Sequence, residues 1–172
     1  DIDTEVYLSS VNEFKTFPEA GIAINEAILM DKNGWVPNVV SHEMTQGLYR
    51  ESNLIMHLVQ KEPSFTHGGV FRKEVIDKIG YLKDECGSLW DWDFCFKAAA
   101  QFPFAISKKP GTINEIHCEN YFLSDMSRYQ WDHWKKFLNN CIENVYLDKT
   151  TRKAVETHLR NKLRTMIKNQ GR

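Results

Sequence analysis

Two short clusters of carboxylates carry the residue types that could do chemistry in this chain. Asp1-Ile2-Asp3 stands just ahead of one predicted helix, and Asp91-Trp92-Asp93 opens another. Carboxylates bind hard divalent cations, and a single carboxylate can remove the proton of an attacking hydroxyl. An aspartate at a helix N-terminus can equally be a simple cap, because its oxygens accept hydrogen bonds from the first backbone N–H groups. Each cluster alone is compatible with both roles.

Histidines, glycines and one arginine lie between the clusters and after the second one. His67 precedes the pair Gly68-Gly69, whose lack of side chains allows a close backbone approach. Arg72 stands at the start of a predicted helix, and His117 follows a predicted strand. Each of these residues has a structural alternative. The histidines can be structural or simply exposed, and the arginine can be a surface residue of its helix. The chain has no H-E-x-x-H, G-x-S-x-G or P-loop motif.

The order of these segments resembles the acceptor half of a family 2 glycosyltransferase. The densest match is residues 66–97, which contain Thr66-His67-Gly68-Gly69-Val70-Phe71-Arg72, a helix ending at Gly80, and then Leu89-Trp90-Asp91-Trp92-Asp93-Phe94. Upstream, Asp1-Ile2-Asp3 matches the D-x-D motif, and Asp31-Lys32-Asn33-Gly34 matches the acidic turn that follows a short strand. The resemblance covers most of residues 1–122. It implies a partial GT-A fold, a Rossmann-like α/β sandwich whose nucleotide-binding half is absent from this sequence.

The resemblance also implies a reaction, the inverting transfer of a sugar from a nucleotide diphosphate sugar to a glycan or lipid-linked acceptor in polysaccharide biosynthesis. By the same resemblance, Asp3 would hold Mn²⁺ or Mg²⁺, Asp1 would support the ribose or the metal shell, and His117 would complete that shell or contact the diphosphate. Asp91 would be the catalytic base. The implied substrate-binding residues are Trp90, Trp92, Asp93, His67, Gly68 and Arg72.

One departure from the family pattern supports an alternative function. Family members usually carry Glu before the aspartate that corresponds to Asp91, and this chain has Trp90 there. The alternative is a non-catalytic carbohydrate-binding or protein-interaction domain that keeps the scaffold without the chemistry. A metal hydrolase is a weaker alternative, because the remaining histidines show no ligand spacing.

The elements that must position these residues form a mixed pattern. Helices are predicted over 4–17, near 48–59, over 71–79 and over 91–101, and two amphipathic helices close the chain. A strand is predicted over 20–30, and two short ones flank a turn at 108–111. Three or four strands are few for an α/β sheet, so we expect further strands upstream of Asp1. The expected parts are an acceptor-side half at 1–122 and a C-terminal helical extension at 123–172.

The amino-acid composition limits the binding partners and the cellular compartment that we expect. The 22 basic residues balance the 23 acidic ones, which argues against a dedicated nucleic-acid binder. Residues 152–172 are weakly basic, which allows peripheral contact with an anionic membrane, and the two terminal helices offer a surface for homo-oligomers. Four cysteines without C-x-x-C spacing favour reduced, buried thiols. With no long apolar run and no signal peptide, we expect a cytoplasmic protein, with any membrane contact at the inner face.

Overall fold

The structure, a computed structural model, describes residues 4–31, 34–40, 43–61, 68–82, 84–116, 130–144 and 146–170. The elements, in chain order, are α1 (Thr4–Thr16), β1 (Ile22–Asp31), β2 (Gly34–Val40), β3 (Gly47–Tyr49), α2 (Glu51–Lys61), β4 (Gly69–Phe71), α3 (Lys73–Ile79), the 3₁₀ helix η2 (Asp84–Leu89), α4 (Trp90–Ala99), β5 (Phe104–Ile116), α6 (Gln130–Glu143) and α7 (Lys149–Gln170). Strands and helices share one chain and one core, which confirms the predicted α/β class.

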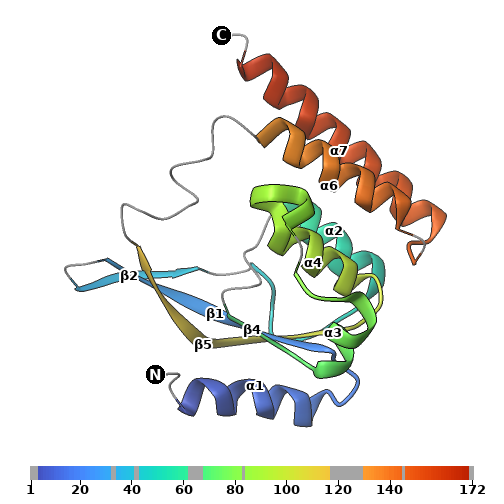
Figure 1. Ribbon diagram of the computed structural model, residues 1–172. Helices are drawn as coiled ribbons and strands as arrows, with labels where there is room; N and C mark the ends of the chain where they lie inside the picture. The colour runs from blue at the N-terminus through green and yellow to red at the C-terminus, as the bar shows by residue number, and fades with distance from the viewer. Residues whose placement is uncertain are drawn as a thin grey trace.

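The sheet is mixed and centres on β1 and β5. Its order is β2-β1-β5-β3, and β4 pairs with β1 off this path (Figure 1). β1 and β5 run parallel, in a register that sets Ile22 against Phe104 at one end and Asp31 against Ile116 at the other. The other pairings are antiparallel. The carboxyl ends of the two central strands therefore lie at one edge of the sheet.

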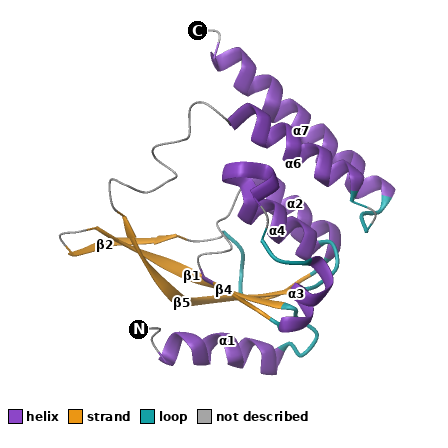
Figure 2. Cartoon of the chain, viewed as in Figure 1, coloured by secondary structure: helices purple, strands orange, loops and turns teal. Residues whose placement is uncertain are grey.

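Helices cover both faces of the sheet (Figure 2). α1 packs on one face, while α2 and α4 lie on the other and the α6–α7 pair lies beyond them. The central strand residues Ile22 to Ile24 and Phe104 to Ile106 are fully buried or nearly so. A parallel strand pair covered on both faces needs apolar residues at consecutive positions, which is why residues 20–24 do not alternate.

Asn25 is a buried polar residue that joins three segments of the fold. Its Nδ2 donates to Ser10 Oγ of α1 at 2.6 Å and to the carbonyl of Gly68 at 3.3 Å. Its Oδ1 accepts from Ser9 Oγ at 3.2 Å. Gly68 can lie this close only because it lacks a Cβ, which would stand 2.3 Å from the carbonyl oxygen of Asn25. The polar pairs fix α1 and β4 against β1, since a buried amide without partners would be costly.

β5 corrects one prediction. The sequence indicated two short strands around a turn at Lys108–Gly111, but residues 104–116 form one strand. The Pro-Gly pair is absorbed by a register irregularity on both sides of the Glu26–Pro110 pairing, where a proline without an N–H group is tolerated. The strands β2, β3 and β4 were not predicted, so the described sheet has more strands than expected. β3 and β4 have three residues each, too few to show periodicity.

The C-terminal helices belong to the hydrophobic core. Trp134, Phe137, Leu138 and Cys141 of α6 and Val155, Leu159 and Leu163 of α7 are buried in the same cluster as the sheet residues. The predicted boundary between residues 122 and 123 lies outside the described residues. Within the described part of the chain, no helix combines the length and the apolar character that crossing a membrane requires.

Candidate functional site

The turn before α4 is shaped by contact with α6. In η2, Gly87 adopts φ 54°, a left-handed conformation that favours glycine. A Cβ there would also lie 2.1 Å from Nε2 of His133, so the imidazole occupies the space beside the glycine. Gly87 and His133 together determine where the chain enters α4, and therefore where Asp91 lies.

Asp91 is partly exposed in the first turn of α4. The N-cap residue is Leu89, without a side-chain cap, so the helix begins at Trp90, one residue earlier than predicted. Asp91 Oδ1 accepts a hydrogen bond from the backbone N–H of Trp92 at 2.8 Å. The unpaired N–H groups and the dipole of a helix N-terminus favour the ionised carboxylate. Asp91 is therefore a carboxylate that is positioned by backbone and still reaches solvent.

The Asp91 carboxylate affects the Cys95 thiol, one turn further along the helix. Burial raises the pKa of the Cys95 thiol, and the nearby Asp91 carboxylate raises it further. Cys95 is therefore a neutral thiol and does not compete with Asp91 as a base. Cys86, Cys95 and Cys141 are buried thiols outside any disulfide, which confirms the prediction for these three, while Cys118 lies outside the described residues.

Asp93 has a different environment from Asp91. Its side chain is buried, with 5% exposure for the residue. Oδ2 pairs with Lys97 Nζ at 2.5 Å, and Oδ1 accepts from Asn140 Nδ2 of α6 at 2.8 Å. Asn140 Nδ2 also lies 3.3 Å from the Cys86 sulfur in η2. Both oxygens of Asp93 are thus engaged by the protein, and Asp93 fastens α4 to α6.

The two tryptophans beside Asp91 also differ. Trp90 is 37% exposed at the start of α4. Trp92 packs edge-to-face on Trp134 and Phe137, with ring centroids 5.6 and 6.4 Å away. The Lys162 ammonium of α7 lies 4.0 Å from the Trp134 ring centroid and 5.9 Å from that of Trp92. Trp90 is the ring that can meet a ligand from solvent, whereas Trp92 mainly packs against α6 and α7.

The Arg72 side chain donates hydrogen bonds to backbone carbonyl groups. Its Nε donates to the carbonyl of Ala20 at 2.8 Å, and Nη2 donates to the carbonyl of Pro18 at 3.1 Å. The guanidinium also lies 4.5 Å above the centroid of the Phe14 ring. The structure therefore places Arg72 against the connection between α1 and β1. Its neighbour Phe71 packs edge-to-face on Phe94 at 5.2 Å, which brings the Gly68–Arg72 segment beside α4.

Four of the predicted site residues, Asp1, Asp3, His67 and His117, lie outside the described residues. Among the residues that the structure does describe, no group of three or more His, Cys, Asp or Glu side chains could hold a metal ion. The metal site expected from Asp1, Asp3 and His117 thus stays a prediction.

Asn140, His133 and Lys162 shape this site and were not foreseen from the sequence. Each acts on η2 or α4 from a helix about 40 to 70 positions further along the chain. No local spacing marks such a contact, because periodicity indicates which face of a helix is buried and not what it meets. No protein-family model, no curated protein and no solved structure matches this chain.

Proposed function

We propose that this chain is the acceptor-binding part of an inverting, metal-dependent glycosyltransferase. The donor would be a nucleotide diphosphate sugar and the acceptor a glycan or a lipid-linked sugar. The observation that carries the proposal is the difference in environment between the two aspartates of the Trp90–Asp93 motif. Asp93 is buried and both of its carboxylate oxygens are bonded to the protein, while Asp91 is partly exposed and follows the exposed Trp90 in the sequence.

The direction of the two parallel central strands also supports the proposed function. Ligands of α/β proteins commonly bind beyond the carboxyl ends of parallel strands. Here Asp31 of β1 and Ile116 of β5 pair at those ends, and His117 follows Ile116 in the sequence. In Figure 1 the N-terminal end of α4, which carries Asp91, points toward this side of the molecule.

In the proposed reaction, Asp91 acts on the acceptor. Its carboxylate accepts the proton of the acceptor hydroxyl while that oxygen forms a bond to the anomeric carbon. The bond from the anomeric carbon to the diphosphate breaks, and its electron pair leaves with the nucleoside diphosphate. Attack from the opposite face inverts the anomeric centre. The face of Trp90 would pack on the C–H face of the acceptor sugar.

The metal belongs to the same proposal. Asp3 and Asp1, with His117, would hold Mn²⁺ or Mg²⁺, which when bound offsets the charge of the departing diphosphate. The proposed setting is polysaccharide biosynthesis in the cytoplasm, at the inner face of the membrane where the acceptor is lipid-linked.

The test, made on the longest natural form of the protein, is release of nucleoside diphosphate from a panel of nucleotide sugars with Mn²⁺ and acceptor glycans. Asp91→Asn should lower the turnover rate by roughly 10²–10⁴-fold with little change in stability. Asp77→Asn is the matched control, because Asp77 is an exposed helix aspartate paired with Lys73. Full activity of Asp91→Asn, or activity that EDTA does not reduce, would overturn the proposed mechanism.

A non-catalytic carbohydrate-binding domain is the second candidate. It is favoured by Trp90, an aromatic ring where the family usually places an acidic residue. In that case no nucleotide sugar is turned over by any variant, and a glycan still binds when Asp91 is replaced by Asn. Loss of that binding in Trp90→Ala would assign the ring to the sugar.

A further inference from the structure

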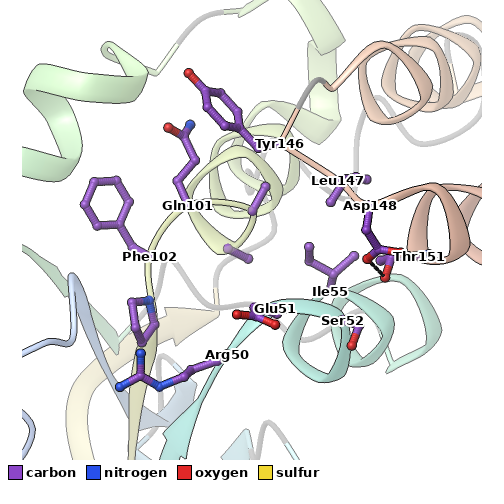
Figure 3. Close-up of a pocket in the computed structure, with 13 residues that line it drawn as sticks. Arg50, Glu51, Ser52, Ile55, Gln101, Phe102, Tyr146, Leu147, Asp148 and Thr151 are labelled. Carbon is purple, nitrogen blue, oxygen red and sulfur yellow. Dashed lines mark hydrogen bonds between the residues drawn. The ribbon is translucent and has the colours of Figure 1, made fainter.

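Two adjoining cavities form a groove at the C-terminal end of α4, away from Asp91. One is about 320 Å³ and lies between the start of α2, the α4–β5 connection and the α6–α7 connection (Figure 3). The other is about 340 Å³ and lies between α3, α4 and α6. Gln101 and Tyr146 line both cavities, which therefore share a wall. We call the two together the C-terminal groove.

Gln101 supplies an acceptor that no described residue of the protein uses. Its Oε1 is buried and has no hydrogen-bond partner within the described part of the chain. In Figure 3 the Gln101 amide lies near Tyr146 at the wall of the first cavity. A buried acceptor without a donor costs free energy that a bound hydroxyl or amide N–H would recover. A ligand with hydrogen-bond donors would satisfy this oxygen once the Gln101 amide turns toward the groove.

Aromatic side chains line the same groove. Tyr146 is 58% exposed, which is high for a ring of this size, and it carries a polar hydroxyl at its tip. Phe102, the residue after Gln101, is partly buried and also lines the first cavity. An exposed ring next to an amide offers one flat apolar face and one set of polar contacts. That combination suits a sugar ring, which has C–H faces and hydroxyl edges.

The charges of the groove balance. Its lining has three cationic residues, Arg50, Lys78 and Lys97, and three acidic ones, Glu51, Glu143 and Asp148. Several of these already have partners within the protein. Arg50 pairs with Glu19 at 2.7 Å, Lys97 pairs with Asp93, and Asp148 accepts from the backbone N–H groups at the start of α7. A balanced lining gives no net attraction for an anion, so we expect a neutral ligand.

We propose that the C-terminal groove binds a neutral glycan, through hydrogen bonds to Gln101 and packing on Tyr146. Gln101 lies ten positions along the chain from Asp91, about 15 Å on a helix axis, and Asp91 lines neither cavity, so the ligand contacts at Gln101 are separate from the proposed reaction. The choice of a glycan rests on the proposed function, since an acceptor chain has to be held beyond its reacting end. The groove would retain a remote part of that chain.

The experiment is an NMR titration of the full-length ¹⁵N-labelled protein with neutral hexasaccharides of glucose, mannose, galactose and N-acetylglucosamine. At least one should shift the Gln101 side-chain amide signals in a saturable way. Tyr146→Ala should weaken its binding by about tenfold or more. Tyr81→Ala is the matched control, because Tyr81 is 82% exposed and lines neither cavity.

Gln101→Met separates recognition from folding. It removes the acceptor while keeping the shape, so it should weaken binding by about threefold to tenfold and leave the melting temperature unchanged or higher. A lower melting temperature would mean that the Gln101 oxygen has a partner in the protein, and would overturn the assignment. So would equal glycan affinity in Tyr146→Ala and wild type, or Gln101 shifts with inorganic pyrophosphate and with none of the hexasaccharides.

The two proposals fail in different ways. Asp91→Asn should bind the hexasaccharide as wild type does, because Asp91 lines neither cavity. Glycan binding without transfer by any variant would overturn the proposed function and keep the groove. Transfer that depends on Asp91, with no hexasaccharide shifting Gln101, would overturn the groove alone.

Discussion

Arg72 holds together two segments that are distant in sequence. It follows β4, yet its guanidinium donates to two carbonyl oxygens in the α1–β1 connection and lies over the ring of Phe14. A planar group with several N–H donors can serve two carbonyls at once, which a lysine ammonium at the end of a flexible chain does less well. The sequence predicted a surface helix residue or, by the family resemblance, a substrate contact to the diphosphate or the acceptor, and the structure adds this third role.

Arg72→Lys should therefore lower the free energy of unfolding by about 1–2 kcal/mol, since one charge-assisted hydrogen bond and the ring contact are weakened. Urea unfolding followed by tryptophan fluorescence measures the change. Arg160→Lys is the control, because that arginine makes an exposed pair with Glu156 and should change stability by less than about 0.5 kcal/mol. Unchanged stability together with lost transfer activity would instead support the diphosphate role.

Gly68 is required by the backbone next to it. A Cβ at this position would lie 2.3 Å from the Asn25 carbonyl oxygen, and a strand backbone cannot move aside as a side chain can. Asn25 is also bonded to Ser9 and Ser10, so any shift would disturb a buried polar network.

We expect Gly68→Ala to lower the free energy of unfolding by about 2–3 kcal/mol, as overpacking in a closed core does. Thermal unfolding by circular dichroism measures it. A variant as stable as wild type would show that β4 can separate from β1 at little cost, contrary to the close approach of Gly68 to the Asn25 carbonyl.

At the scale of elements, α4 is held by the two C-terminal helices. Asn140 bonds to Asp93, His133 fills the space at Gly87, and Trp134 packs on Trp92. Lys162 of α7 completes this contact by placing its ammonium over the Trp134 ring. The helix that carries Asp91 is therefore positioned from outside residues 66–97, the segment on which the predicted function rests.

Burial lowers the pKa of Lys162 from 10.5 to about 8, while the ring of Trp134 favours the charged form. Between these two pH values the unfolded chain binds more protons than the folded chain, so this residue makes stability rise with pH. Below pH 8 the lysine is charged in both states and its desolvation cost is complete. Above about 10.5 that cost is gone.

We expect the stability difference between wild type and Lys162→Met to move by about 1 kcal/mol in favour of wild type between pH 7.5 and 10.5, after allowance for solvent screening. Urea unfolding at a series of pH values gives the difference directly. Lys153→Met, at an exposed position of the same helix, should show no such trend. A constant difference for Lys162→Met would mean that the ammonium is well solvated in the folded protein.

At the scale of the whole molecule, the α6–α7 pair is part of the core. Leu159 and Cys141 are fully buried, and Phe137 packs edge-to-face on Phe96 of α4 with centroids 5.8 Å apart. Removing the pair would expose α2 and α4, which cover one face of the sheet (Figure 1). The C-terminal helices thus contribute directly to the stability of the sheet domain.

A chain that ends at Tyr129 should consequently lose cooperative unfolding and bind the dye ANS, because the buried faces of α2 and α4 become exposed. A chain that ends at Gln170 is the control and should unfold as the complete chain does. Circular dichroism and ANS fluorescence measure both. Cooperative unfolding of the shorter chain would show that the C-terminal helices form a separable extension.

The sequence was sufficient for elements with a long, regular pattern. α1, α2, α4 and the central strand β1 lie within a few residues of their predicted bounds, and Gly80 ends α3 with φ 85° as a glycine C-cap should. Periodicity and capping are local properties, so one sequence contains them. The same holds for the α/β class, which follows from the alternation of such elements.

Features that depend on contacts between residues distant in sequence could be identified only from the tertiary structure. β5 runs through Pro110 because β1 pairs with it in parallel, and a turn would otherwise fit those residues. The difference between Asp91 and Asp93 was equally hidden, since the two share a motif, and the burial of Asp93 and its bond to Asn140, 47 positions further on, are contacts between distant segments. The residue types at the site were set by the sequence, whereas the burial and hydrogen bonds that decide which of them can meet a ligand arise from contacts between distant segments.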